Sequence, residues 1–269
     1  MTNTISAGAN PDLANDLINK VLAEKPVEVD VQLTLPSDTS VTLPGGYINA
    51  AGEVVTEAEV RELTGQDEEA VAKSSTLGKA LMTIIQRGTV KVGNEKATES
   101  MLDSMLAGDR DALLLGIFRA TFGNTAELKT WCNTCSELKD VEIDVNQDIK
   151  TKILGDSVND RVFTVKGKKQ EITLRLPTGF VQKELITNAD KTAAELNTIL
   201  LEHCVVKIGD SPVLSKFQVQ AMGITDRQLC IEEINNRVPG PQFDAVSITC
   251  PDCEGEVTVP INLGNLFRL

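Results

Sequence analysis

Apolar and polar positions along this chain follow two periods, and together these predict a mixture of strands and helices. Alternation at every second residue, typical of a strand with one buried face, runs over 27–35, 54–60 and 141–145. Apolar residues spaced as on one face of a helix run from Leu77 to Ile85. A hairpin is predicted within 41–48, where Gly45-Gly46 interrupts an apolar stretch. We therefore predict the α+β fold class.

The segment 1–30 is predicted to form an N-terminal helical arm. Asn10-Pro11 opens a stretch whose apolar residues, from Leu13 to Leu22, share one helical face, and Pro26 ends it. Two interpretations stay open for this helix. It packs on its own domain, or it becomes ordered only on a partner protein.

Landmarks of the first half of the sequence return in the second half. The stretch Ile84–Asn94 reappears in kind as Leu200–Asp210, at an offset of 116 residues. Asp109-Arg110 returns as Asp226-Arg227 at an offset of 117, and each pair opens an apolar helix. Upstream, a further match relates Val41–Tyr47 to Ile172–Phe180, two stretches that each combine alternating apolar residues with a glycine turn and an aromatic residue.

Offsets that drift by one residue at a time are what a duplicated module with small loop insertions would give. We predict a first module at 31–149 and a linker with the second module at 150–269. In each module we expect a hairpin first, then helices, and then strands that carry a cysteine pair. Two similar tandem modules are thus predicted after the N-terminal arm.

Four of the six cysteines form two Cys-x-x-Cys knuckles, Cys132 with Cys135 and Cys250 with Cys253, at an offset of 118. Two intervening residues let both thiolates of a knuckle point at one ion, and two knuckles supply the tetrahedral ligand set of structural zinc. We predict one structural Zn²⁺ per chain, shared by the two modules. An approximate two-fold axis between the modules would bring the four cysteines together.

The residues around the knuckles affect the interpretation. Pro251 presets the second turn, and Gly255 is expected to take a positive φ behind the ligands. A thioredoxin-like redox pair would begin a helix, whereas strand-like residues follow both knuckles. Redox chemistry and unligated thiols remain as alternatives. Cys204 and Cys230 replace Gly88 and Leu113 in the repeat, so we expect them to be small buried side chains.

Composition narrows the function classes. The chain has 269 residues, 41% hydrophobic, with one Trp, one Tyr and seven Phe, so its core must be built from aliphatic side chains. A formal net charge of −13 opposes general nucleic-acid binding, because phosphate contacts need a surplus of Lys and Arg. The longest apolar stretch, Ala112 to Phe118, is too short to span a bilayer. We expect a soluble protein made inside the cell, with its thiols in a reducing compartment.

The joint between the predicted modules is locally basic. The segment 146–169 contains six basic residues, namely Lys150, Lys152, Arg161, Lys166, Lys168 and Lys169. One interpretation is an exposed linker followed by the lysine-protected edge of a hairpin. The other is a docking surface for an acidic partner.

No set of residues points to catalysis. His203 is the only histidine, and an enzyme hypothesis would pair it with Cys204 or Asp210 as base and nucleophile. Its counterpart in the first module is Arg87, which a duplicated catalytic base would not predict. The two Asp-Arg pairs are better interpreted as helix N-terminal residues, with Asp capping the helix or favouring its dipole and Arg reaching across the module. We predict that the protein is not an enzyme.

Three stretches of the first module carry a family resemblance. They are Leu43-Pro44-Gly45-Gly46-Tyr47, then Val60–Glu69 with its acidic helix start, and then Asp109-Arg110 to Phe122-Gly123 leading into the first knuckle. In these features residues 41–145, and to a lesser degree the second module, resemble the base plate protein family of T-even-type contractile phages. That family belongs to the baseplate hub and its assembly.

The resemblance implies a structural or assembly component of a contractile-tail baseplate, in the hub region, or of a related contractile injection system. Other baseplate, hub or tail proteins are the expected partners, in an oligomeric assembly without nucleic acid or membrane. The expected location is the bacterial host cytoplasm during assembly and then the baseplate of the virion or tail-like particle. The alternative hypothesis is a cytoplasmic zinc-ribbon adaptor or regulatory protein that is not part of a tail.

Overall fold

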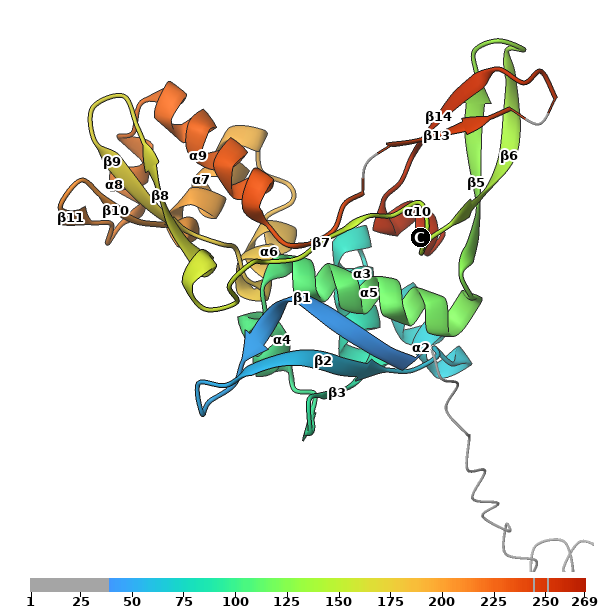
Figure 1. Ribbon diagram of the computed structural model, residues 1–269, viewed down its shortest axis with the longest axis horizontal. Coiled ribbons are helices and arrows are strands. Elements are labelled where there is room, and N and C mark those ends of the chain that lie inside the picture. Colours follow the sequence, from blue (N-terminus) through green and yellow to red (C-terminus); the bar gives the residue numbers. More distant parts are fainter. Residues whose placement is uncertain (1–38, 244, 251) are drawn as a thin grey trace, which may run out of the picture. The chain divides into compact units, whose positions relative to one another are not determined.

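The computed structural model describes residues 39–243, 245–250 and 252–269 (Figure 1). The predicted arm at 1–30, the predicted strand at 27–35 and Pro251 lie outside the described residues. Helices and strands are mixed throughout the described part, so the α+β class is confirmed. Within that part, no helix has the length and apolar content needed to cross a membrane.

The first half of the described chain forms an antiparallel sheet with four strands in the order β1-β2-β3-β4. Its elements are β1 (Ser40–Ile48), β2 (Val54–Val60), α2 (Gly65–Ala72), α3 (Leu77–Gly88), β3 (Thr89–Val92), β4 (Glu95–Lys96), α4 (Glu99–Ser104) and α5 (Ala107–Phe122). The hairpin predicted within 41–48 is wrong, because the chain turns later, at Asn49–Glu53. Gly45-Gly46 instead belongs to an irregularity of β1 between Thr42 and Tyr47.

Helix α5 is the centre of the main core. Its Leu113 and Ile117 are completely buried, and they belong to the same apolar cluster as Ile84 and Ile85 of α3. A Cβ at Gly116 would lie 2.2 Å from a methyl carbon of Val41, so the missing side chain lets the helix approach β1 closely. Aliphatic side chains make up almost all of this cluster, as the scarcity of aromatic residues predicts.

The second half repeats this order of elements and of strands. Its sheet runs β8-β9-β10-β11, and its elements are β8 (Val162–Lys166), β9 (Glu171–Arg175), α6 (Gly179–Thr187), α7 (Ala193–Cys204), β10 (Val205–Ile208), β11 (Ser211–Pro212), α8 (Lys216–Gln220) and α9 (Ile224–Arg237). The predicted match of Val41–Tyr47 with Ile172–Phe180 is wrong. Val41 lies in an edge strand, whereas Ile172 lies in the second strand of its sheet.

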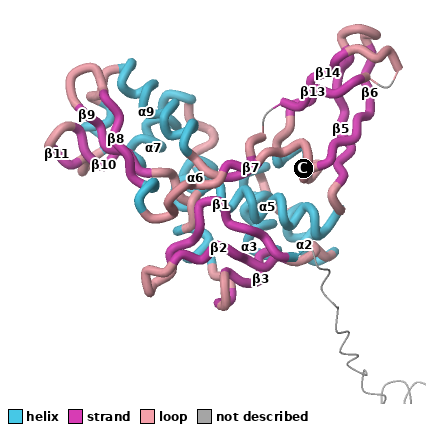
Figure 2. The backbone as a smooth tube through the Cα atoms, in the orientation of Figure 1, coloured by secondary structure: helices cyan, strands magenta, loops and turns pink. Residues whose placement is uncertain are grey.

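Short elements join the two halves, and each half leads into a β-hairpin. The joining elements are β7 (Thr151–Lys152), which pairs with β12 (Gly240–Pro241), and a 3-10 helix at Asn159–Arg161. The hairpins are formed by β5 (Thr125–Cys132) with β6 (Glu137–Asp144) and by β13 (Ala245–Thr249) with β14 (Glu256–Pro260); α10 (Leu263–Leu266) follows. The two hairpins lie side by side (Figure 2), and Thr130 donates a hydrogen bond to the carbonyl of Thr258 at 3.2 Å.

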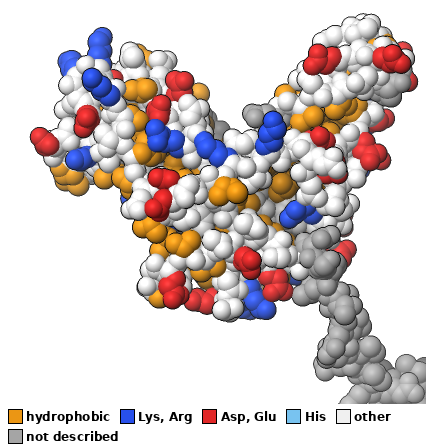
Figure 3. Space-filling view, viewed as in Figure 1, with side chains coloured by type: hydrophobic (Ala, Val, Ile, Leu, Met, Phe, Trp, Pro, Cys, Tyr) orange, Lys and Arg blue, Asp and Glu red, His pale blue; other side chains and the backbone are white. Residues whose placement is uncertain are grey.

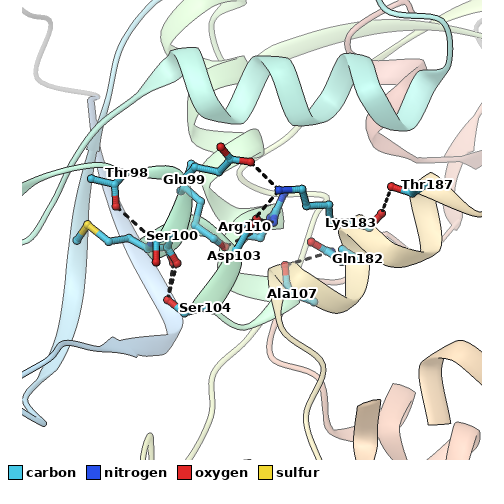
Figure 4. Close-up of polar contacts among 12 residues, drawn as sticks. Thr98, Glu99, Ser100, Asp103, Ser104, Ala107, Arg110, Gln182, Lys183 and Thr187 are labelled. Atoms are coloured by element: carbon cyan, nitrogen blue, oxygen red, sulfur yellow. Dashed lines mark hydrogen bonds and ion pairs between the residues drawn. The ribbon is translucent and has the colours of Figure 1, made fainter. Parts of the chain in front are cut away.

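The two helical parts touch through different surfaces of each half. The amide of Ala107 donates to the carbonyl of Pro177 at 2.9 Å, and the amide of Gly179 donates to the carbonyl of Met105 at 2.8 Å. Around this backbone contact, Lys183 forms ion pairs with Glu99 at 2.6 Å and with Asp103 at 3.1 Å (Figure 4). The contact therefore joins α4 and the start of α5 to the start of α6.

This helical contact is not two-fold. A two-fold axis between the halves would also place the start of α2 against α8 and the start of α9. Gly65 at the start of α2 has nothing within 4 Å of an added Cβ in the described part of the chain, and Ile224 at the start of α9 is 76% exposed. The predicted two-fold relation therefore does not hold for the helical parts.

Gly179 and Gly65 each begin a helix directly after a threonine, and they form a matched pair for testing the contact. A Cβ at Gly179 would lie 2.3 Å from the carbonyl oxygen of Leu102, whereas Gly65 has open space. We expect Gly179→Ala to lower the free energy of unfolding by about 1–3 kcal/mol, and Gly65→Ala to raise it by at most about 1 kcal/mol. Denaturant titrations of both variants check this, and equal losses would contradict it.

Candidate metal centre

The four knuckle cysteines lie at the turns of the two hairpins. Cys132 is the last residue of β5, and Cys135 lies in the turn that leads to β6. Cys250 follows β13 directly, and Cys253 lies in the turn before β14. Since the hairpins pack side by side, the turns bring cysteines from both halves of the chain to one place.

The spacing of the sulfur atoms suits a tetrahedral metal ion. All four Sγ atoms lie within 4.8 Å of one another, with 3.6 Å between Cys132 and Cys253 and 4.0 Å between Cys135 and Cys250. Metal–sulfur bonds of about 2.3 Å give a tetrahedron with edges of about 3.8 Å. A disulfide needs about 2.05 Å, and all four cysteines are free. These four residues could therefore hold a metal ion.

The backbone turns behind the second cysteine of each knuckle are alike. Ser136 has a φ of 53° and Glu254 a φ of 56°, so both adopt the left-handed conformation. The expectation that Gly255 takes the positive φ is wrong by one residue. Gly255 serves another purpose, because a Cβ there would lie 2.6 Å from Oγ1 of Thr134 in the opposite knuckle. The glycine lets the two turns approach each other.

Backbone amides already favour negative charge at the cluster. The amide of Cys135, more than any other group, lowers the pKa of the Cys132 thiol to about 6. Burial, together with the neighbouring sulfurs, raises the pKa of Cys135 to about 12. The thiolate of Cys132 is thus favoured, whereas burial and the neighbouring sulfurs disfavour a thiolate at Cys135. A bound divalent cation would favour the thiolate at all four positions.

A half-buried lysine after the first knuckle forms an ion pair with an aspartate inside the second knuckle. The side chain of Lys139 is 10% exposed, and its ammonium group lies 2.6 Å from the carboxylate of Asp252 and also contacts Glu137. The hydrogen bond to Asp252 is the main reason why the pKa of Lys139 is raised. The sequence did not predict this ion pair, although Lys139 follows the first knuckle by four residues and Asp252 lies inside the second.

The local structure argues against the redox alternative. Each cysteine pair lies at a hairpin turn and is followed by a strand, whereas a thioredoxin-like pair needs a helix start to lower the pKa of its nucleophilic thiol. The sulfur contacts noted above also run between the knuckles, from Cys132 to Cys253 and from Cys135 to Cys250. The arrangement suits one centre shared by four ligands.

The residues considered for catalysis lie in other elements than the knuckles: His203 and Cys204 end α7, and Asp210 lies between β10 and β11. Within the described residues, no hydrogen bond joins the His203 ring to the side chain of Cys204 or Asp210. The His203 ring packs edge-on against Phe180, with 5.3 Å between the ring centroids. Cys204 is completely buried, and burial raises the pKa of its thiol to about 12. Cys230 is also buried, with its pKa raised to about 11. The prediction that Cys204 and Cys230 are small buried side chains is confirmed.

Both Asp-Arg pairs lie in the first turn of a helix, as predicted, but neither aspartate caps its helix. Asp109 accepts a hydrogen bond from the amide of Gly45 at 2.6 Å. The guanidinium of Arg110 reaches the carbonyl of Leu102, and that of Arg227 reaches the carbonyl of Val219. Each arginine thus ties its helix to the short helix before it.

The basic joint has two structural roles. Lys166 ends β8, which is an edge strand, so the interpretation as a lysine-protected edge is confirmed for this residue. Arg161 contacts the carbonyl of Gly46, and Lys152 contacts the carbonyl of Asn236. These contacts hold the joint to both halves. The docking of an acidic partner stays a prediction.

Comparison with known proteins gives one family. The family model described as T4 bacteriophage base plate protein matches residues 29–210, about two thirds of the chain. No curated protein and no solved structure matches the chain. The matched stretch includes the first knuckle and both four-stranded sheets up to the end of β10, and it ends before Cys250. It contains the whole region 41–145 in which the sequence analysis identified the resemblance, which is thereby confirmed.

Asp109 gives a prediction about pH. It is completely buried, its Oδ2 has no hydrogen-bond partner in the described part of the chain, and burial raises its pKa to about 6. The unfolded value is about 3.9. The folded state therefore holds the proton more tightly, and this carboxyl contributes stability below about pH 4 that is lost as the pH rises through 6.

We expect Asp109→Asn to remove this loss and to keep the hydrogen bond from Gly45. Between pH 4 and pH 7 the variant should gain about 2–3 kcal/mol in unfolding free energy relative to the unsubstituted protein. Urea titrations across this range measure the difference. Asp226→Asn is the matched control, because Asp226 occupies the same turn of α9 and is only half-buried. Parallel pH curves for the unsubstituted protein and Asp109→Asn would contradict the prediction.

Proposed function

The chain belongs to the T4 bacteriophage base plate protein family, and we propose that it works in the hub region of a contractile-tail baseplate or of a related contractile injection system. The family match, which covers about two thirds of the chain, carries this conclusion. It supports a structural role in a phage baseplate, as a component of the virion tail. The hub position and the binding of neighbouring hub or tail proteins are the finer parts of the proposal.

Action through surfaces fits the chemistry of the chain. A structural family favours a role without catalysis. The His203 ring packs against Phe180, and burial raises the pKa of the Cys204 thiol, which disfavours a nucleophilic thiolate there. The net charge of −13 opposes nucleic acid as the partner. On the face drawn in Figure 3, basic, acidic and hydrophobic side chains are interspersed, without one continuous basic surface. Protein surfaces of mixed character are therefore the expected partners.

The alternative, a cytoplasmic zinc-ribbon adaptor outside any tail, is not favoured. Its main support was the pair of cysteine knuckles, and these serve both hypotheses equally well. The family match favours only the first. We propose that the protein is made in the cytoplasm of the bacterial host and acts during or after tail assembly there.

We also propose that the chain consists of two related modules, at 31–149 and 150–269, behind the arm at 1–30. Three details beyond the order of elements support common descent. Gly93 and Gly209 have the same φ of 58° in equivalent turns, and Arg110 and Arg227 reach equivalent carbonyls eight residues upstream. The left-handed residue behind each knuckle is the third such equivalence.

We propose that the four cysteines bind one structural Zn²⁺ that holds the two hairpins together. Thiolate ligands in a tetrahedral set select zinc among the common divalent ions. Joining two knuckles more than a hundred residues apart costs about 4 kcal/mol of chain entropy. Structural zinc contributes on the order of 10 kcal/mol when four thiolates bind it. The ion would therefore stabilise the pairing of the hairpins by a wide margin.

A zinc assay tests this centre. We expect about one zinc per chain by elemental analysis, and metal–sulfur distances of about 2.3 Å by X-ray absorption. Cys250→Ser should lose the metal and increase amide hydrogen exchange in both hairpins, because β5–β6 then also loses its partner. Cys204→Ser is the control, since Cys204 is buried away from the cluster and the variant should keep its zinc. A metal-free protein with four titratable knuckle thiols and a stable fold would contradict the proposal.

The biological role is tested in the phage. Deleting the gene should stop the assembly of complete tails, as seen by electron microscopy of the lysate and by loss of infectious titre. The full-length gene supplied in trans should restore both. A version with Cys250→Ser should restore them only partly, if the zinc-stabilised form is the active one. Normal infectious particles from the deletion strain would overturn the baseplate role.

A further inference from the structure

The contact between the two halves uses two surfaces, and each surface has an unused equivalent elsewhere in the chain. The surface at 177–183 consists of the turn before α6 and the first turn of that helix, and we call it the head face of the second half. The tail face of the first half is α4 with the first turns of α5, at 99–111. The equivalent head face of the first half lies at 63–69, and the equivalent tail face of the second half lies at 216–228.

Both equivalent faces are open in the described part of the chain. Gly179 is so closely packed that a Cβ would lie 2.3 Å from Leu102 O, whereas Gly65, at the same position of α2, meets nothing within 4 Å. Ala107 is 6% exposed in the used tail face, whereas its equivalent Ile224 is 76% exposed. Glycine at an open first helical position weakens a helix, and nothing in the described part of the chain requires a glycine there for steric reasons.

The backbone groups of the contact are also available on the open faces. In the used contact the amides of Ala107 and Gly179 donate to carbonyls of the opposite half. The equivalent amides, of Ile224 and Gly65, donate no hydrogen bond within the described residues. Both are first helical residues, whose amides have no acceptor inside their own helix.

The open faces also carry side chains that could pair with each other, but the two members of each pair have changed faces relative to the used contact. Lys183 of the used head face pairs with Glu99 of the used tail face at 2.6 Å. At the equivalent open positions stand Glu69 and Lys216, both exposed, so the ion pair could form again with its charges reversed.

The second polar pair behaves in the same way. Gln182 donates a hydrogen bond to the carboxylate of Asp111 at 3.3 Å in the used contact. The equivalent open positions hold Glu68 and Gln228, both exposed, so acceptor and donor have again changed sides. At both pairs of positions the side chains have changed faces and can still attract each other. This favours the open head face as the partner of the open tail face.

Apolar side chains surround the open tail face. Leu214, Phe217 and Ile224 are 85%, 80% and 76% exposed, and they are the three most exposed large hydrophobic residues in the described part of the chain. They lie just before α8, in α8 and at the start of α9. Exposed apolar side chains at neighbouring positions are a common feature of protein–protein interaction sites.

From these observations we infer that this protein associates with a second copy of itself, the tail face of one chain's second half docking on the head face of the other chain's first half. The two faces differ, so the contact is heterologous and each added copy presents a new open face. The assembly therefore grows into a ring or an open chain. The inference uses only the equivalence of the two contacts and does not depend on the baseplate role.

Complementary blocking of the two faces tests this inference on the full chain. Gly65→Arg blocks only the head face, and Ile224→Arg blocks only the tail face; both positions are exposed, so the fold should be retained, which thermal melts check. In sedimentation velocity the unsubstituted protein should show species that grow with concentration. Each variant alone should remain a monomer, with self-association weakened at least about tenfold. An equimolar mixture of the two variants should form dimers and nothing larger, because one intact contact remains.

Exchange of the predicted ion pair gives a second, independent measurement. Glu69→Lys and Lys216→Glu should each weaken self-association by about two- to fivefold, which is typical of an exposed ion pair. The double variant should recover most of this loss. Ile153→Arg is the control, because Ile153 is 72% exposed outside both faces and its replacement should change nothing. A monomeric unsubstituted protein at all concentrations, or a mixture of blocked variants without dimers, would overturn the inference.

Discussion

The whole described structure depends on close backbone contacts around the first turn of α5. A Cβ on Gly108 would lie 1.5 Å from the carbonyl oxygen of Pro239, and Gly240, with a φ of 121°, lies directly against Gly108. On the same turn, Ala107 donates its amide to Pro177. Three stretches from distant parts of the sequence thus meet on one helical turn, and a side chain at either glycine would force them apart.

This junction determines where the second hairpin begins. The segment at 239–243 leaves α9, passes the first turn of α5 and continues to β13. The first hairpin follows the C-terminal end of α5, and the second follows the segment that packs on the first turn of α5, so this helix supports the starting points of both hairpins. The four sulfurs then need only two tight turns to come within 4.8 Å of one another. A metal ion would strengthen a pairing that the packing of the hairpins already favours, with Val141 and Ile143 in the same apolar cluster as Val259 and Ile261.

Much of this local structure could be predicted from the sequence, because it depends on residues that are near each other in the chain. The helix expected at Leu77–Ile85 is α3, and the alternation at 54–60 is β2. The four clustered cysteines were also identified, because Cys-x-x-Cys spacing needs no knowledge of the fold. The shift of positive φ from Gly255 to Glu254 shows the limit of such local rules, since Gly255 is required by Thr134 of the distant knuckle.

The relation between the two halves could not be predicted in this way. A repeated sequence suggests a symmetric pair, yet Gly179 is packed tightly where Gly65 is open. The path of the joint between the halves decides which of the two equivalent glycines is covered. Contacts such as that of Arg161 with the carbonyl of Gly46 fix this path. These contacts join residues more than a hundred positions apart, and neither propensity nor periodicity reports on them. The same limit applies to Asp109 of α5, which accepts its hydrogen bond from Gly45 of the distant strand β1.

The two kinds of contact between the halves have opposite consequences for assembly. A metal ion bound by the cysteines would close the hairpin contact, because two sulfurs from each knuckle would fill all four positions of a tetrahedral site. The helical contact is open, because it covers one of two equivalent faces in each half. The two hairpins of one chain thus pair with each other, whereas one equivalent face of each helical part stays exposed in the described structure. If copies of the chain associate as inferred above, the assembly would grow through the helical parts, and a metal-bound cysteine centre would keep the two hairpins of each chain together.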